Sequence, residues 1–227
     1  MLENAPTIIG LTGANGAGKD TVASMLQAAL HGQNRKTAIV AFADALYQEV
    51  ARAFNCTIEQ LQLRSTKEQP IKALMLSMCG DPWFHWSIEQ ACNVPVALDE
   101  PRSPRQILQW WGTEYRRTQN PQYWVQRFQK TAQALLATEV KHVIVTDVRF
   151  ADEAECIRAM GGEVWCVLRH NHQPAGTGHI SEVTGKEFAP EATIHNAGSL
   201  NALQLNSWQA LYSSHMVRAQ ALQKGGV

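Results

Sequence analysis

The amino-acid sequence predicts an α/β fold in which a parallel sheet is flanked by helices. The first apolar run, residues 8–11, leads through a glycine-rich turn into a helical pattern that ends near residue 31. A second apolar run, within residues 36–44, is followed at once by a helical pattern over residues 45–54. Strands and helices that alternate from the N-terminus favour a parallel sheet, whose ligands gather at the carboxyl ends of the strands.

The turn between the first strand and the first helix is suited to holding an anion. Gly13, Gly16 and Gly18 let backbone N–H groups converge on a phosphate without Cβ clashes, and the helix start adds its positive dipole end. Lys19 supplies a charge for the outer phosphates. The alternative is a glycine turn that binds nothing. The candidate nucleotide-binding residues of this turn are Gly13, Ala14, Asn15, Gly16, Ala17, Gly18, Lys19, Asp20 and Thr21.

Asp20 departs from the pattern G-x-x-x-x-G-K-[ST], and Thr21 follows it. A hydroxyl at the last position of the pattern normally contacts Mg²⁺. A carboxylate there can ligate the metal directly or through water, but it also repels the phosphates if it faces them. Asp20 is therefore a candidate metal ligand.

Composition restricts the class of protein. The chain has 227 residues, 45% of them hydrophobic and 18% charged, with a formal net charge of zero, so we expect one domain with insertions and no polyanion binding. No apolar run approaches the roughly 20 residues of a membrane span, and no basic segment precedes an apolar one at the N-terminus. We expect a cytoplasmic protein whose five cysteines, without C-x-x-C spacing, are reduced thiols.

Beyond residue 54 the sequence predicts more helices and strands around one irregular stretch. Residues 81–104 carry four prolines among aromatic residues, so we expect an irregular insertion there. Residues 169–190 form a polar, glycine-bearing loop that is typical of a lid. The other expected elements are helices over 58–63, 68–78, from 104 onward, 120–137, 152–160 and 200–222, and strands over 142–147, 164–168 and within 193–200.

Several polar residues fall where a ligand would lie. Asp147 ends an apolar run, and in a protein with such a glycine loop this places a carboxylate beside the phosphates, where it orients Mg²⁺ or its waters. Arg105 and Gln109 are four residues apart on a predicted helix and share one face. Asp44 ends the second strand, where it either caps a helix or contacts a substrate.

The sequence shows no Ser-His-Asp or Cys-His grouping and no protein-kinase catalytic loop. A phosphomonoester acceptor needs no general base, because its second pKa is about 6 and its oxygen is already anionic near pH 7. Such an acceptor needs positive charge, and guanidinium groups bind phosphate bidentately. The charge cluster that contains Arg64 is equally typical of a solvated surface. The candidates are Arg64, Arg105, Arg117, Arg149 and Arg169.

Six blocks together resemble the deoxynucleoside monophosphate kinases of bacteriophages and prophages. The resemblance runs from the glycine loop to about residue 203 and is weakest across residues 55–104. The loop and the last turn are shared with dephospho-coenzyme A kinase and phosphomevalonate kinase. The blocks are residues 13–21, Arg105-x-x-Leu108-Gln109-x-x-Gly112-Thr113-Glu114 with Arg117, Tyr123-Trp124-Val125, Asp147-Val148-Arg149-Phe150-x-x-Glu153-Ala154, His179-x-Ser181-Glu182 and Ile194-x-Asn196-x-Gly198-Ser199-Leu200.

The resemblance implies a single P-loop kinase domain over residues 1–227 with a central five-stranded parallel sheet. It implies a helical acceptor-binding insertion at about 44–125 and a lid at about 169–190. The implied reaction converts a deoxynucleoside monophosphate (dNMP) and Mg²⁺·ATP to the diphosphate (dNDP) and ADP.

The resemblance also implies a role for each site residue. The implied catalytic residues are Lys19, Arg105, Arg117, Arg149 and Asp147. Besides residues 13–21, ATP would be bound by Arg169 and Asn196. The acceptor would be contacted by Asp44, Arg64, Gln109, Trp111 and Glu153. Mg²⁺ would be held by Asp20 and Asp147.

Two other functions stay open at this stage. One is a related small-molecule kinase of the dephospho-coenzyme A or phosphomevalonate type. The other is a nucleotide-binding regulatory ATPase that acts through a protein partner. We expect small-molecule nucleotides as ligands, with no nucleic acid polymer and no membrane, and the sequence leaves open whether the protein forms a homodimer.

Overall fold

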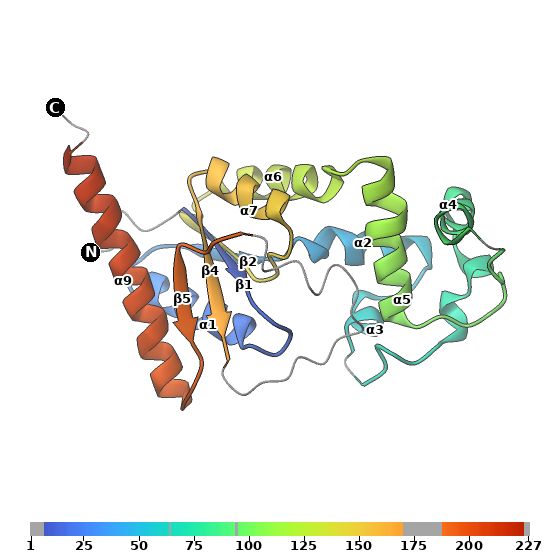
Figure 1. Ribbon diagram of the computed structural model, residues 1–227, viewed down its shortest axis with the longest axis horizontal. Helices are drawn as coiled ribbons and strands as arrows, with labels where there is room; N and C mark the ends of the chain where they lie inside the picture. The colour runs from blue at the N-terminus through green and yellow to red at the C-terminus, as the bar shows by residue number, and fades with distance from the viewer. Residues whose placement is uncertain (1–6, 64, 94, 170–187, 225–227) are drawn as a thin grey trace. The chain divides into compact units, whose positions relative to one another are not determined.

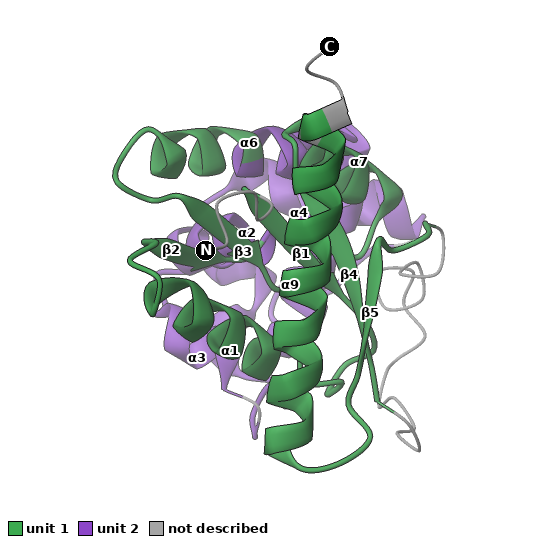
Figure 2. Ribbon diagram, turned by 90° about the vertical axis from the view of Figure 1, so that its left-hand side faces the viewer, with its two compact units in different colours: residues 1–41, 129–227 green, residues 42–128 purple. Residues whose placement is uncertain are grey.

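The computed structural model describes residues 7–63, 65–93, 95–169 and 188–224 (Figure 1). The chain divides into two compact units, coloured separately in Figure 2. Unit 1 comprises residues 1–41 and 129–227, and unit 2 comprises residues 42–128. Among the described residues, no helix is both long and apolar enough to cross a membrane.

Unit 1 is built on a five-stranded sheet in which every pair of neighbouring strands is parallel. The strand order is β2-β3-β1-β4-β5, so the strand before the glycine loop lies at the centre. This confirms the predicted α/β fold with a five-stranded parallel sheet. The strands are β1 (Ile8–Thr12), β2 (Thr37–Val40), β3 (His142–Val145), β4 (Glu163–Leu168) and β5 (Ala192–His195).

Helices cover both faces of this sheet. Ile9 and Leu11 of β1 belong to a buried cluster with side chains of α1 (Lys19–His31) and α9 (Leu200–Lys224). On the opposite face, a Cβ on Gly10 would lie 2.7 Å from Ile157 Cδ1, which shows how closely α7 (Ala151–Ala159) packs on β1. Figure 2 shows α6 (Tyr123–Leu136) on the same side as α7. The three-layer arrangement exposes the loops at the carboxyl ends of the strands, where the predicted site lies.

Unit 2 is helical, with its own core. Its centre is aromatic: the ring of Phe84 lies 4.7 Å from Trp111 and 5.5 Å from Tyr115, measured between centroids. These rings pack with aliphatic side chains of the surrounding helices, all buried. The elements are α2 (Ala43–Ala53), α3 (Ile58–Gln62), η1 (Lys72–Leu74), η2 (Leu76–Met78), α4 (Pro82–Cys92), α5 (Pro104–Gln109), the π-helix η3 (Trp110–Arg117) and the first part of α6.

The predicted helix over residues 68–78 is wrong. Pro70 disfavours helical backbone at the residue before it. Ile71 then forms an isolated antiparallel bridge with Arg102, donating its N–H to the Arg102 carbonyl at 3.0 Å. Two short 3₁₀ turns follow, separated by Met75 in extended conformation. The bridge fixes extended backbone where a continuous helix was expected.

The expected irregular insertion over residues 81–104 is wrong for its first half, which forms α4. Asp81 caps this helix, because its Oδ1 accepts the Trp83 N–H at 3.0 Å, and Pro82 occupies the first helical position. Asn93 ends it in the left-handed conformation, with φ of 53°. Asp81 followed by Pro82 is a helix-start signal in the sequence, but the four prolines of this stretch favoured the prediction of irregular structure.

The helix predicted to start at residue 104 is confirmed at its start and changes character further on. Ser103 caps α5, accepting the Gln106 N–H at 3.2 Å. From Trp110 to Arg117 the backbone widens into a π-helix. A run of this length is rare, and π-helical turns are frequent at functional sites. The widening changes which side chains share a face, so α-helical spacing does not place Arg117 relative to Arg105.

Candidate functional site

The glycine loop (residues 13–21) has the backbone conformation that its glycines predict. Gly13 has φ of 138° and Gly18 of 102°, both unfavourable for residues with a Cβ. A Cβ on Gly13 would lie 2.3 Å from the Val167 carbonyl oxygen, and one on Gly18 would lie 2.7 Å from Asn196 Nδ2. The two glycines therefore allow the loop to approach β4 and the segment after β5 closely.

Lys19 starts α1 and folds its side chain back over the loop. Its Nζ donates to the carbonyl oxygens of Gly13, at 2.8 Å, and Ala14, at 3.0 Å. Burial lowers the pKa of Lys19, and the charge of Arg149 lowers it further, whereas Asp20 and Asp147 act in the opposite direction. These four charged groups therefore lie close enough to interact.

The segment after β3 carries Asp147 and Arg149 and is fixed by Glu153. Glu153 is buried, and its Oε2 accepts the backbone N–H groups of Arg149, at 2.8 Å, and Phe150, at 3.2 Å. Arg149 is exposed and Asp147 is partly buried. Glu153, expected to contact the acceptor, thus holds the turn that presents Arg149.

Two predicted ATP residues contact the glycine loop from the ends of β4 and β5. Arg169, directly after β4, donates from Nη1 to the Gly16 carbonyl oxygen at 3.2 Å. Asn196, directly after β5, donates from Nδ2 to the Ala17 carbonyl oxygen at 2.8 Å. Residues more than 150 positions apart in the sequence therefore meet at this loop. Most of the predicted lid, residues 170–187, lies outside the described residues.

The residues that could hold Mg²⁺ are Asp20 and Asp147. Mg²⁺ is usually bound by one or two carboxylates together with substrate phosphates and water. Asp20 is exposed in the first turn of α1, and both carboxylates interact with the Lys19 ammonium group. Their oxygen chemistry and their position beside the glycine loop fit this metal.

In unit 2, Arg105 is held by its neighbours. Its guanidinium group forms an ion pair with Glu68, and its backbone N–H donates to the Lys67 carbonyl oxygen at 3.0 Å. Lys67 Nζ in turn contacts Tyr47 Oη at 2.8 Å. Arg105 remains partly exposed.

The other predicted site residues of unit 2 lie in different surroundings. Asp44 is exposed in the first turn of α2, and Gln109 and Arg117 are partly exposed at the end of α5 and of the π-helix. Trp111 is buried in the aromatic core and donates from Nε1 to Glu49 at 3.0 Å. Arg64 lies outside the described residues.

Sequence reasoning missed Glu49, which joins three elements of unit 2. Its carboxylate on α2 accepts hydrogen bonds from Trp111 and Arg116 of the π-helix and from Tyr123 of α6. Arg116 also stacks on aromatic rings, with its Cζ 4.4 Å from the Tyr115 ring centroid. Burial lowers the pKa of Arg116, but the Glu49 carboxylate outweighs this effect and raises it. No motif marks Glu49, because its partners are more than 60 residues away.

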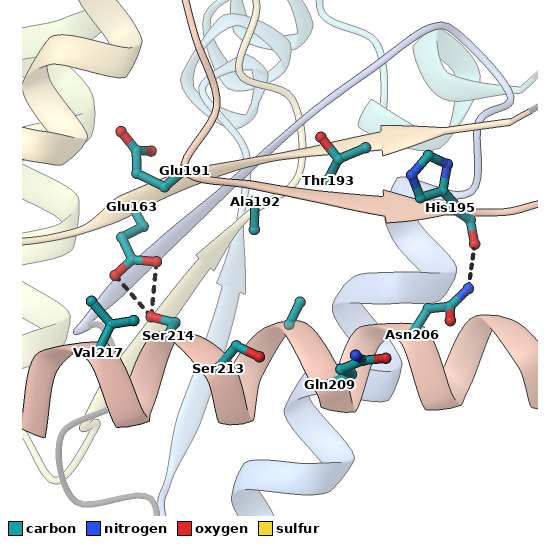
Figure 3. Close-up of a pocket in the computed structure, with 11 residues that line it drawn as sticks. Glu163, Glu191, Ala192, Thr193, His195, Asn206, Gln209, Ser213, Ser214 and Val217 are labelled. Atoms are coloured by element: carbon teal, nitrogen blue, oxygen red, sulfur yellow. Dashed lines mark hydrogen bonds between the residues drawn. The ribbon is translucent and has the colours of Figure 1, made fainter.

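A separate groove lies between β5 and α9 of unit 1 (Figure 3). Glu163 lines it and accepts hydrogen bonds from Ser214 Oγ and Arg218 Nε, each at 2.8 Å. Asn206 donates from Nδ2 to the His195 carbonyl oxygen at 2.7 Å. None of the predicted nucleotide-binding residues lines this groove.

The parallel sheet, covered on both faces by helices and carrying a glycine loop before its first helix, defines an α/β protein with a P-loop kinase-like fold. The model of the family described as deoxynucleotide monophosphate kinase matches residues 46–206, more than half of the chain. The chain belongs to this family and is a kinase, a phosphotransferase with nucleotide substrates. The resemblance predicted from the sequence is confirmed. A search of the curated proteins found no match.

Proposed function

We propose that this protein transfers the γ-phosphoryl group of ATP to a deoxynucleoside monophosphate, giving the diphosphate and ADP. The observation that carries the proposal is the family match over residues 46–206, which contains Arg105, Asp147 and Arg149. It is supported by the charged groups that gather around Lys19 in unit 1.

In this proposal unit 1 binds the donor. The backbone amides of the glycine loop and the Lys19 ammonium group hold the outer phosphates of ATP. Lys19 then exchanges its contacts with the Gly13 and Ala14 carbonyl oxygens for phosphate oxygens. Asp20 and Asp147 hold Mg²⁺, which neutralises phosphate charge when bound. Arg169 and Asn196 form the edge of the loop toward the nucleoside.

Unit 2 binds the acceptor in this proposal, which makes residues 42–128 the counterpart of the helical insertion expected at about 44–125. Arg105 and Arg117 bind the acceptor phosphate, and Arg149 of unit 1 neutralises phosphate charge. Asp44, Arg64 and Gln109 contact the sugar or the base. Two predicted acceptor residues act indirectly: Trp111 supports the π-helix from the core, and Glu153 positions Arg149.

The reaction does not require a general base from the protein. A phosphomonoester has a second pKa of about 6, so its attacking oxygen is anionic at neutral pH. The remaining task is to bring two polyanions together, which calls for positioning and positive charge. Arginine suits it, since its planar group binds phosphate oxygens in pairs.

A coupled assay of ADP release tests the proposal. We expect ADP release to depend on adding dAMP, dCMP, dGMP or dTMP, with at least one strong acceptor. Dephospho-coenzyme A and phosphomevalonate in the same panel cover the related kinases. ADP release that is independent of every acceptor would instead support a regulatory ATPase and contradict the proposal.

A further inference from the structure

The side chains of Lys67 and Tyr47 form a pair of polar groups in unit 2. Lys67 Nζ donates to Tyr47 Oη at 2.8 Å and lies 5.5 Å from the centroid of the tyrosine ring. Both residues are partly buried, and Tyr47 packs against the aromatic core of the unit. The core therefore fixes the phenol, and the phenol fixes the ammonium group.

The backbone of Lys67 is held by a β-turn and by α5. The Gln69 N–H donates to the Thr66 carbonyl oxygen at 2.9 Å. Lys67 and Glu68 are the two central residues of this turn. The Lys67 carbonyl oxygen accepts the Arg105 N–H at 3.0 Å, and the Glu68 carboxylate pairs with the Arg105 guanidinium group. The turn thus brings Lys67 next to the first turn of α5.

Lys67 differs from Arg105 in how its charge is balanced. Arg105 has the carboxylate of Glu68 as an ion-pair partner. Within the described ranges of the chain, no carboxylate lies within ion-pair distance of Lys67 Nζ, whose hydrogen-bond partner is the Tyr47 hydroxyl. Because charged groups that are withdrawn from water are normally paired, this cation is suited to an anion from outside the chain.

The pair also has hydrogen-bond donors to spare. An ammonium group has three N–H donors, and a phenol has one O–H donor. The Lys67 ammonium group uses one donor on Tyr47 Oη, and no acceptor among the described residues takes the other two or the Tyr47 O–H. Neighbouring donors without an acceptor match an anion with several oxygen atoms, such as a phosphate group.

The pair lies beside residues that the proposed function assigns to the acceptor. Asp44 is three positions before Tyr47 on α2, and residues at this spacing lie on one side of a helix. Arg105 lies next to Lys67, as described above. Helices α2 and α5 lie side by side in unit 2 (Figure 1). Lys67 and Tyr47 therefore connect the two elements that carry these acceptor residues.

On the basis of the proposed function, we propose that Lys67 binds the phosphate group of the acceptor monophosphate. Tyr47 positions the ammonium group and donates a further hydrogen bond to the same phosphate. A monophosphate carries about 1.5 to 2 negative charges near pH 7. Since Glu68 already offsets part of the charge of Arg105, the Lys67 ammonium group supplies positive charge that this phosphate needs.

A structural role for the pair leads to a different expectation. If Lys67 only held the turn at residues 66–69 on α2, its loss would affect every ligand of unit 2 alike. A contact with phosphate instead affects only ligands that carry the phosphate. A deoxynucleoside monophosphate and the matching deoxynucleoside therefore distinguish the two roles.

Isothermal titration calorimetry of the full chain with each of the four dNMPs and the matching deoxynucleosides tests the proposal. We expect Lys67→Ala to weaken binding of the best dNMP at least about tenfold and to leave the affinity for its deoxynucleoside within about twofold. Lys67→Arg, which keeps the charge, should retain most of the affinity, and Tyr47→Phe should cause a smaller loss. Lys72→Ala is the matched control, since Lys72 is an exposed lysine of the same segment and should leave both affinities unchanged.

Steady-state kinetics separate the acceptor from the donor. Lys67→Ala should raise the KM for the acceptor at least about tenfold and leave the KM for ATP within about twofold, because the assigned phosphate belongs to the acceptor. A rise in the KM for ATP alone would overturn the proposal. Far-ultraviolet circular dichroism confirms that each variant is folded, and Lys67→Met, which keeps a long side chain, replaces Lys67→Ala if that variant does not fold.

Unchanged dNMP affinity in Lys67→Ala would overturn the proposal while the proposed function holds. An equal loss of affinity for the dNMP and for the deoxynucleoside would also overturn it, because the pair would then have a structural role. If the unaltered chain bound no dNMP, the proposed function itself would fail, and the role of Lys67 would fail with it.

Discussion

The Lys19 ammonium group has a well-defined position in unit 1. It lies over the glycine loop on two carbonyl oxygens, and its pKa is lowered first by burial and then by Arg149. The lowered pKa reflects mainly the cost of burying the ammonium group, to which the positive charge of Arg149 adds. In the proposed function, the negative charge of a bound phosphate group would offset that cost.

Replacing Lys19 by Ala should therefore lower kcat by at least a hundredfold while changing the KM for ATP much less. The expected pattern follows because the charge is needed most in the transition state. Steady-state kinetics with the best acceptor measure it. Lys36→Ala is the matched control, since Lys36 pairs with Glu139 on the surface of the same unit and should keep full activity. A near-normal kcat for Lys19→Ala would refute the assigned role.

We expect Glu49 to stabilise the folded protein, although no sequence motif marks it. Glu49→Ala removes the shared acceptor of Trp111, Arg116 and Tyr123 and leaves a partly buried guanidinium group without its carboxylate. We expect a loss of about 3 kcal/mol in the free energy of unfolding, measured by urea denaturation. Glu139→Ala, which breaks an exposed ion pair, should cause no measurable change. Equal stability of the two variants would contradict the role of Glu49.

Tyr115 should make stability depend on pH in the alkaline range. Burial, followed by its hydrogen bond to Asp81, raises the pKa of Tyr115 to about 12, whereas an unfolded tyrosine ionises near 10. The unfolded state therefore loses its proton first, and stability from this group is lost as pH rises from about 10 to 12. Tyr115→Phe should lose less stability than the unaltered chain across that interval. Thermal unfolding of both proteins at several pH values measures this. If the melting temperatures of the unaltered chain and of Tyr115→Phe fell equally over that interval, the assigned role of Tyr115 would be contradicted.

At the scale of elements, the glycine loop depends on close approach to β4. Gly13→Ala places a Cβ 2.3 Å from the Val167 carbonyl oxygen, and that backbone atom cannot move without distorting the sheet. Gly161→Ala is the matched control, since Gly161 has φ of 76° but nothing within 4 Å of its Cβ, leaving only about 1–2 kcal/mol of backbone strain.

We expect Gly13→Ala to weaken binding of a non-hydrolysable ATP analogue at least tenfold, as measured by calorimetry. Gly161→Ala should leave the affinity within twofold, although both variants are less stable. If the two variants bound the analogue equally well, the close approach of the loop to β4 would have no part in nucleotide binding.

The elements of the sheet unit were predictable from the sequence, and those of unit 2 were less so. Apolar runs and caps located β1, α1, β3 and β4 because each is local to the chain. The backbone of residues 68–78 depends instead on the pairing of Ile71 with Arg102, which no local pattern reveals. The π-helix likewise depends on contacts with α2 and α6, including Glu49.

The candidate site was also predictable where its features are local to the chain and less so where they depend on distant contacts. The glycine loop and Lys19 were predictable because their spacing is a direct consequence of phosphate geometry. The contacts of Arg169 and Asn196 with the loop arise from the strand order β1-β4-β5, and their predicted role in binding ATP stays a prediction. Trp111 and Glu153 were expected at the ligand, but their burial and partners give them supporting positions.

At the scale of the whole molecule, the proposed function requires two kinds of anion site. Unit 1 presents backbone amides and an ammonium group, and unit 2 presents guanidinium groups on helices. The formal net charge of zero means that this positive charge is local to the sites and not a general property of the surface.

The most direct measurement of the central claim is ³¹P nuclear magnetic resonance of a reaction with Mg²⁺, ATP and each of the four dNMPs. We expect that, for the best acceptor, the dNDP signals rise in a one-to-one ratio with those of ADP. Formation of ADP together with inorganic phosphate and without any dNDP would contradict it.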